Sequence, residues 1–287
     1  YTVTGGGPYC VGAGGASIGI DGSDVGVTYH LYNGPTLVGA PVLGTGAPID
    51  FGPQATPGVY TVLAINATTG CAQPMTGSTV VTISNLPNVY SLSVSGPSHY
   101  CSGGPGVELL LSNSQLGVDY QLYVAGVPVG AAVGGTGSAI SFGTQTTAGV
   151  YIAVATGSGT GCSINMAGTA NITIDPLPAS YNVTGGGTYC AGGAGLHTGL
   201  SLSSSGITYQ LQLSGSDIGT PVNGTGSAID FGIQTGAGPY TVVATNNVTG
   251  CVANMNGAAT ININSLPAVY TVTGGGSYCA GDTGVHV

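Results

Sequence analysis

The 287-residue chain contains no lysine and no arginine, and only nine of its residues are acidic. A protein without basic side chains has nothing with which to neutralise phosphate groups, which argues against nucleic acids and anionic membrane surfaces as partners. The same absence excludes amine chemistry, so the chain forms neither a Schiff base nor a lysine–asparagine isopeptide crosslink. Because charged residues make up only 3% of the sequence, we expect the surface to favour association with further copies.

Two other features are missing. Tryptophan is absent, and no apolar run reaches the roughly 18 residues of a membrane-spanning helix. Glycine, in contrast, is abundant with 55 residues, and 42% of the chain is hydrophobic. Glycine does not recur at every third position as it does in collagen, and the hydrophobic content is too high for a disordered chain. The composition therefore indicates a folded protein with many turns.

The sequence repeats with a period of about 90 residues. The opening "YTVTGGGPYC" returns as "YNVTGGGTYC" at Tyr181 and "YTVTGGGSYC" at Tyr270, with a looser copy at Tyr90, and successive copies start 89, 91 and 89 residues apart. Each copy has the size of a small domain. We expect three domains at 1–89, 90–180 and 181–269, followed at 270–287 by the start of a fourth, as in a segment of a longer array.

Short β-branched and aromatic runs alternate with glycine turns and predict an all-β fold. In the first copy they predict seven strands, at 1–4, 16–20, 27–32, 36–42, 48–51, 58–65 and 78–84. The second and third copies repeat this pattern, including a strand at "DIGTPV" (217–222) in the third. Seven short strands in about 90 residues are typical of an immunoglobulin-like sandwich. The predicted fold is a set of tandem seven-stranded immunoglobulin-like β-sandwiches in an elongated array.

Residues that every copy keeps at one position predict the core. They are Phe51, Phe142 and Phe231, Met75, Met166 and Met255, and Tyr60, Tyr151 and Tyr240. Between copies run "SNLPNVY", "DPLPASY" and "NSLPAVY", in which proline fixes φ and biases the preceding leucine to an extended conformation. We therefore expect short, stiff connectors that place the domains end to end.

The cysteines keep their register in every copy. They are Cys10, Cys71, Cys101, Cys162, Cys190, Cys251 and Cys279, and the two of each full copy lie 61 residues apart. No two cysteines are closer than 28 residues and the histidines occupy unrelated positions, which argues against a zinc site. The spacing instead predicts a disulfide framework formed in an oxidising, extracellular compartment.

Two disulfide pairings are open. Pairing within a copy would join Cys10 to Cys71 across a 61-residue loop. With seven alternating strands, however, the first cysteine follows strand one and the second follows strand six, at opposite ends of the domain and too far apart for a disulfide. The strand count therefore favours bonds between neighbouring copies, Cys10 with Cys162 and Cys101 with Cys251, and one missed strand would reverse that preference. Cys71, Cys190 and Cys279 would then pair with further copies.

No catalytic, cofactor or metal site is predicted. No aspartate, glutamate or histidine recurs in all three full copies, and Ser141 stands where the other copies have Asp50 and Asp230. The "TGGGxYC" stretch lacks the lysine and the helix of a phosphate loop and is interpreted as a turn. "DGSD" at 21–24 is interpreted as a polar turn rather than a calcium site. Weak N-glycosylation motifs occur at Asn66, Asn171, Asn182, Asn223 and Asn247.

The stretches "YTVTGGGxYC", "GTGSAIDFG", "TGC" and "LPAVY" resemble the tandem immunoglobulin-like or PKD-like repeats of very large Bacteroidota cell-surface proteins. The resemblance covers the whole chain. It implies a bacterial, secreted protein that is exported across the outer membrane and displayed as a fibre, stalk or adhesin. We expect a structural extracellular filament or stalk without catalysis, whose partners are neighbouring repeats and further copies of itself in a homopolymer or lateral bundle. The alternative is an adhesin whose loops bind a surface or a glycan.

Overall fold

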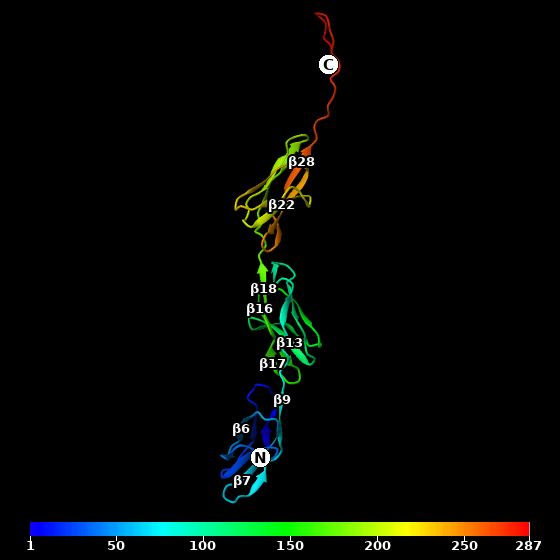
Figure 1. Cartoon of the computed structure of the whole chain (residues 1–287). Coiled ribbons are helices and arrows are strands. Elements are labelled where there is room, and N and C mark those ends of the chain that lie inside the picture. Colours follow the sequence, from blue (N-terminus) through cyan, green and yellow to red (C-terminus); the bar gives the residue numbers. More distant parts are fainter. Residues whose placement is uncertain (287) are drawn as a thin grey trace. The chain divides into compact units, whose positions relative to one another are not determined.

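The computed structural model describes residues 1–286 of the chain (Figure 1). These residues form strands, turns and irregular segments, and the part of the chain that is described holds no helix, so the all-β prediction is confirmed. It accordingly includes no helix long and apolar enough to cross a membrane. Contacts divide the chain into two compact units, one formed by Tyr1–Tyr100 with Gly104–Ile174 and the other by Cys101–Gly103 with the residues from Asp175 onward.

The first unit contains the first two repeats. In the first repeat the strands are β1 (Val3–Gly5), β2 (Gly7–Cys10), β3 (Ala16–Ile20), β4 (Val27–Asn33), β5 (Thr36–Leu43), β6 (Ile49–Gln54), β7 (Gly58–Asn66), β8 (Ala72–Pro74) and β9 (Thr79–Ser84). One sheet has the order β1-β3-β6 and the other the order β2-β9-β7-β4-β5, with β8 also paired to β7. This is the strand order of an immunoglobulin-like sandwich whose first strand is divided between the two sheets.

The second repeat has the same arrangement. Its strands are β10 (Leu92–Ser95), β11 (His99–Cys101), β12 (Val107–Leu111), β13 (Val118–Val124), β14 (Val127–Gly134), β15 (Ile140–Gln145), β16 (Gly149–Gly157), β17 (Ser163–Asn165) and β18 (Ala170–Asp175). They form sheets of order β10-β12-β15 and β11-β18-β16-β13-β14, with β17 beside β16.

The second unit holds the third repeat. Its strands are β19 (Val183–Gly185), β20 (Gly187–Cys190), β21 (Leu196–Leu200), β22 (Ile207–Leu213), β23 (Ser216–Asp217), β24 (Val222–Asn223), β25 (Ile229–Gln234), β26 (Gly238–Asn246), β27 (Val252–Asn254) and β28 (Ala259–Asn264). The sheets have the orders β19-β21-β25 and β20-β28-β26-β22-β23. The single strand predicted at 217–222 is wrong, because this part of the chain forms two short strands, β23 and β24, which pair separately with β22.

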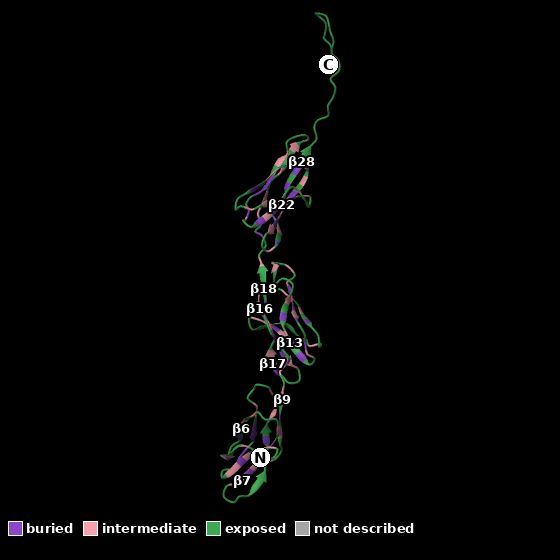
Figure 2. Cartoon of the chain, viewed as in Figure 1, coloured by how far each residue is buried: buried purple, intermediate pink, exposed green. Residues whose placement is uncertain are grey.

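Each repeat has its own hydrophobic core between its two sheets (Figure 2). Tyrosine dominates these cores, since Tyr29, Tyr60, Tyr120, Tyr151, Tyr209 and Tyr240 are all less than 2% exposed. Their hydroxyl groups are paired: Tyr60, for example, donates to the Thr56 carbonyl oxygen at 2.7 Å. Burial raises the pKa of Tyr120 and of Tyr151 above the usual tyrosine value. Phenylalanines at the shared position (Phe51, Phe142 and Phe231) pack against the cores while half-buried.

The repeated "TGGGxYC" stretch is a divided strand, so its interpretation as a turn is wrong. In the first repeat, β1 pairs with β3 in one sheet, and β2 then pairs in parallel with β9 in the other. The chain crosses between the sheets at Gly5–Gly7, where all three glycines have φ between +76° and +106°. Only glycine adopts this backbone without strain, and a Cβ at Gly5 would also overlap the Ser17 carbonyl oxygen.

This crossing predicts a stability effect in the third repeat. Gly185 has φ +93°, and a Cβ there would overlap the carbonyl oxygen of His197. We expect Gly185→Ala to destabilise the repeat by at least about 2 kcal/mol, as judged by denaturant unfolding followed by circular dichroism. Gly192→Ala is the matched control, because φ is +81° there and a Cβ would meet no atom within 4 Å. Equal losses in the two variants would contradict the role of the close approach.

The start of the fourth copy behaves differently from the other three. Residues 265–286 contain no strand, and Val272 is 79% exposed although its counterpart Val3 is 8% exposed. The domain boundaries at 89, 180 and 269 stay a prediction, because each repeat has a core of its own while the contacts divide the chain into two units and not three.

Candidate functional site

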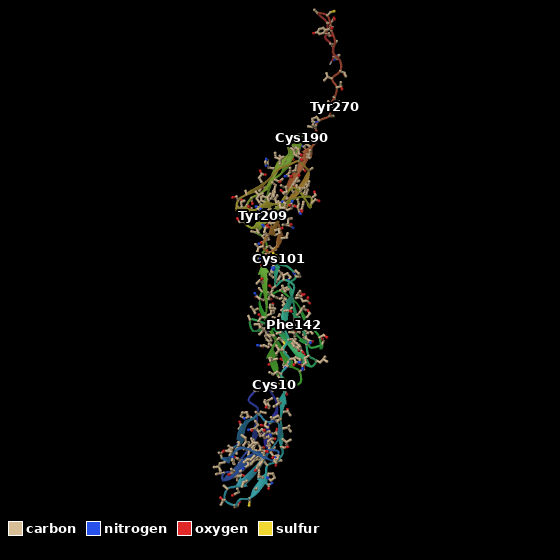
Figure 3. The ribbon with its side chains drawn as sticks, in the orientation of Figure 1. Cys10, Cys101, Phe142, Cys190, Tyr209 and Tyr270 are labelled. Carbon is tan, nitrogen blue, oxygen red and sulfur yellow. A yellow bond between two sulfur atoms is a disulfide. The ribbon has the colours of Figure 1, made fainter. Side chains whose placement is uncertain are left out.

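The feature that recurs with most constant geometry is the pair of cysteine positions in each repeat. The first position lies at the end of the parallel strand next to the point where the chain leaves the sandwich. In repeat 1 this is Cys10, which is in register with Ser84, the last residue of β9. The Val11 amide donates to the Ser84 carbonyl oxygen at 2.9 Å, which continues the pairing beyond the strand. Cys10 therefore lies at the end of the first repeat that faces the second (Figure 3).

The second position lies in the tight turn between β7 and β8 of repeat 1, and at the same place in the other repeats, between β16 and β17 and between β26 and β27. In repeat 2 the Gly157 amide donates to the Cys162 carbonyl oxygen at 2.9 Å, and the Gly161 amide donates to the Gly157 carbonyl oxygen at 2.8 Å. Thr160 Oγ1 accepts a hydrogen bond from the Cys162 amide at 3.3 Å. Gly161 has φ +70°, and Gly70 and Gly250 have nearly the same value in the other repeats. The shared "TGC" sequence thus specifies one turn that presents one cysteine.

Two disulfides join the first position of one repeat to the second position of the next. Cys10 is bonded to Cys162 and Cys101 to Cys251, with Cα–Cα distances of 5.6 and 5.5 Å. The structure therefore shows the pairing between copies that the strand count favoured, and not the pairing within a copy. The two extra strands do not reverse it: β2 continues the direction of β1 into the other sheet, and β8 lies in line with β9 beside β7.

The bond changes the surroundings of the second position. Cys162 and Cys251 are 1% and 0% exposed, whereas Cys71, at the same position of repeat 1, is a free and exposed thiol. Cys190 and Cys279, at the first position of their copies, are also free and exposed. Cys190 lies at the end of the third sandwich from which the chain continues to Tyr270 (Figure 3). That these three cysteines pair with further copies stays a prediction.

The connector of the first unit is also seated by noncovalent contacts. Pro87 is buried, and the Asn88 amide donates to Gln115 Oε1 at 3.1 Å. The Tyr90 amide donates to the sulfur of Met166 at 3.4 Å, and the Tyr181 amide does the same with Met255 in the second unit. This contact gives the shared methionine position a role that sequence comparison alone did not assign. The first connector is thus held to repeat 2 by hydrogen bonds as well as by the disulfide next to it.

One set of buried residues was not predicted. Ser23, Ser114 and Ser203, at one position of each repeat, are at most 2% exposed. Ser114 Oγ donates to the Ser138 carbonyl oxygen at 2.6 Å and accepts from the Thr136 amide at 2.9 Å, so it fastens the "GTG" loop. Identity of residue type in all three copies is the signal that points to these serines.

The "DGSD" segment is also fixed by hydrogen bonds. Asp21 Oδ1 accepts a hydrogen bond from the Thr2 amide, and Asp24 Oδ1 accepts one from the Tyr1 hydroxyl.

Titratable groups are scattered. The described residues include no group of three or more His, Cys, Asp or Glu side chains placed to hold a metal. His197 and Asp230 form a cross-strand pair at 2.8 Å on the surface, with side chains 63% and 62% exposed. The hydrogen bond from His197, with one from the Gly232 amide, lowers the pKa of the Asp230 carboxyl. Glu108 and Ser141 hold the same positions in repeat 2, and such exposed pairs contribute little to stability.

Four of the five asparagines in N-glycosylation motifs are exposed, and Asn66 is half-buried. The Asn66 side-chain oxygen accepts the amides of Thr68 and Thr69, each at 3.0 Å, so this side chain forms part of the turn before Cys71. Glycosylation of Asn66, Asn171, Asn182, Asn223 and Asn247 stays a prediction.

Comparison with known proteins gives similarity to immunoglobulin-like structures at low identity. No family model and no curated protein sequence matches the chain. The three-domain ectodomain of mouse nectin-like molecule 4 is 14% identical, covering 92% of this chain and 99% of that chain, with a TM-score of 0.34. The three N-terminal domains of the bacteriophage RB49 highly immunogenic outer capsid protein are 12% identical, with coverages of 92% and 98% and a TM-score of 0.32. The fibronectin(III)-like modules of Clostridium thermocellum CbhA cover 61% of this chain and 95% of that chain, at 14% identity and a TM-score of 0.37.

Proposed function

We propose that the chain is a structural segment of an extracellular filament or stalk, built from disulfide-joined sandwich repeats and without a catalytic role. The observation that carries this proposal is the pairing of Cys10 with Cys162 and of Cys101 with Cys251. A disulfide within a domain would stabilise that domain alone. A disulfide between successive repeats stabilises the connection of one repeat to the next. A filament needs this property, whereas a binding or catalytic domain does not need it.

Two further observations support the assignment. Disulfides persist in oxidising compartments, which supports a location outside the cytosol or at the cell surface. The absence of basic residues and the low charge favour association of chains with one another. We propose further copies of the chain and neighbouring repeats as its partners, and a large bacterial surface protein of the Bacteroidota type, carrying glycans at exposed asparagines, as its context.

The runner-up is an adhesin. It draws on a shallow hollow of about 310 Å³ on the three-stranded sheet of repeat 1, lined by polar groups that include Thr4, Ser17, Asp21 and Asp50. Such a mixture of hydroxyl and carboxyl groups suits a sugar. A hollow of about 250 Å³ in repeat 3 lies at a different place, around Phe231 and Thr220. Binding to a glycan array, lost in an Asp50→Ala variant, would favour the adhesin.

Small-angle X-ray scattering tests the structural role. Sandwiches with strands of up to nine residues are roughly 30 Å long, so the proposed filament, in which three of them would follow in line, requires a rod of about 100 Å with a radius of gyration near 30 Å. A compact chain of this length would have a radius of gyration of about 19 Å. We expect the larger value, and a broader distribution of distances after reduction because the junctions can then bend. A value near 19 Å in the oxidised protein would contradict the proposal.

A further inference from the structure

The two disulfides are interlaced along the sequence. From the N-terminus, the bonded cysteines come in the order Cys10, Cys101, Cys162 and Cys251. Cys101 therefore lies inside the loop that Cys10 and Cys162 close, and Cys162 lies inside the loop that Cys101 and Cys251 close. Each bond spans about 150 residues of backbone, with separations of 152 and 150. The covalent connectivity of the chain is therefore different from that of a simple string of domains.

Two short covalent routes follow from this order. The first, which we call path 1, runs from Tyr1 to Cys10, crosses the disulfide to Cys162, and continues through the second connector to Cys190. The other, path 2, runs from Cys71 through the first connector to Cys101, crosses to Cys251, and continues to Cys279. Between disulfide positions these routes need only 28, 30 and 28 backbone steps, from Cys162 to Cys190, Cys71 to Cys101 and Cys251 to Cys279.

A large part of both paths is β-strand, which is already extended. Path 1 contains β1 and β2, then β17, β18, β19 and β20, and path 2 contains β8 to β11 and then β27 and β28. Each connector adds a proline whose φ is fixed. An extended strand rises about 3.3 Å per residue, close to the longest span that a residue can reach. The strand segments of these paths therefore hold little slack.

The two paths lie side by side inside every repeat. In repeat 1, β2 of path 1 pairs in parallel with β9 of path 2, from Gly7 opposite Val81 to Cys10 opposite Ser84. The same parallel contact joins β20 and β28 in repeat 3, and β11 is the neighbour of β18 in repeat 2. A parallel pair pulled at opposite ends is loaded in shear, so its hydrogen bonds resist together and not one after another.

Most of the hydrophobic core lies outside both paths. The strands that carry Tyr29, Tyr60 and their counterparts belong to the segments between Cys10 and Cys71, Cys101 and Cys162, and Cys190 and Cys251. These segments connect one path to the other, and neither path runs through them. Unfolding of a core strand therefore releases no length to a path that is under tension.

We infer that tension along this protein is carried by paths 1 and 2, two parallel covalent routes of extended backbone, while the cores hold those routes in register without bearing the load. This inference rests on the proposed structural function and deepens it. Free Cys71, Cys190 and Cys279 occupy the positions at which both paths would continue into flanking repeats. A filament of such repeats behaves under load as a pair of linked chains and does not lengthen by unfolding its domains.

Single-molecule force spectroscopy tests this inference. In a Cys71→Ser/Cys279→Ser background the Cys190 thiol provides one attachment point and the N-terminus the other. Path 1 offers 9 steps from Tyr1 to Cys10 and 28 from Cys162 to Cys190, so the oxidised chain should extend to at most about 13 nm. After reduction all 189 steps become available and the limit rises to about 66 nm. Cys10→Ser should give about 56 nm, since the route through Cys101 and Cys251 then remains, with 161 steps.

The alternatives give separate lengths. In this background, pairing within copies would leave only a bond between Cys101 and Cys162, with 128 steps and a limit of about 45 nm, and an oxidised chain that reaches about 66 nm has no closed path, so either length would overturn the inference. The scattering result is independent of this one. A chain that is compact in solution but stops at about 13 nm would contradict the filament and leave the two paths standing. A chain that is extended in solution but lengthens to about 66 nm under force would support the filament and overturn the two paths.

Discussion

Trypsin will cut an Asn88→Lys variant at one place, and the two fragments will stay covalently joined until they are reduced. The chain contains no lysine or arginine, so the substitution creates a single site in the first connector, where the Asn88 side chain is exposed. Fragments 1–88 and 89–287 are held by the bond between Cys10 and Cys162. With free thiols blocked by alkylation to prevent exchange, a denaturing gel should show one band without reductant and two bands with it.

Matched variants make this outcome specific. Adding Cys10→Ser to Asn88→Lys should release the two fragments without reductant, whereas adding Cys71→Ser should change nothing. Ala179→Lys places the same single site in the second connector and reports on the bond between Cys101 and Cys251. Separation of the Asn88→Lys fragments in the absence of reductant would overturn the pairing between repeats, because disulfides within repeats cannot bridge a cut connector.

Thermal unfolding is the second large effect. In the chain-entropy model, a disulfide that closes a loop of about 150 residues stabilises the folded state by roughly 5 kcal/mol. For a cooperative unit of about 170 residues each kcal/mol shifts the midpoint by roughly 2–4 °C. We expect Cys10→Ser to lower the midpoint of the first unit by about 10–20 °C, measured by calorimetry without reductant.

The control for the thermal experiment is Cys71→Ser, which removes an exposed free thiol and no disulfide. Its midpoint should stay within about 1 °C of the parent, as expected for a surface change. A Cys10→Ser variant with the same midpoint as the parent would show that the disulfide adds no stability to the first unit. The same loss in both variants would point to pairing of Cys10 with Cys71.

Most of the correct predictions came from the constant spacing of the cysteines and from the number of strands in each repeat. The disulfide pattern needed only the direction of each strand, and alternating strands give that direction even when their ends are uncertain. The divided strand at Gly5–Gly7 was missed because three successive glycines indicate a turn by local propensity, whereas here they carry the chain from one sheet to the other. Pairing with β9, which is over 70 residues away, decides the outcome.

One sequence in two conformations shows why local patterns have this limit. "YTVTGGGPYC" and "YTVTGGGSYC" differ at one residue, Pro8 against Ser277. The first forms β1 and β2, which pair with β3 and β9, and the second, which has no such partner strands in the structure, forms no strand among the described residues. Strand propensity here is the fit to a half-buried surface that other strands provide. The contact between Tyr90 and Met166 could not be predicted for the same reason. It depends on how two segments that are far apart in the sequence lie in the folded repeat.

The interlaced order of the disulfides also determines what damage the protein survives. The bond from Cys10 to Cys162 bridges any break in the backbone between those residues, and the bond from Cys101 to Cys251 bridges any break between its own two ends. Together they cover every peptide bond from Cys10 to Cys251, and they cover the stretch from Cys101 to Cys162 twice. A single hydrolysed peptide bond or protease nick anywhere in that range leaves one molecule. If the protein forms the extracellular filament proposed above, which could not be resynthesised in place, this tolerance to backbone breaks would matter as much as strength.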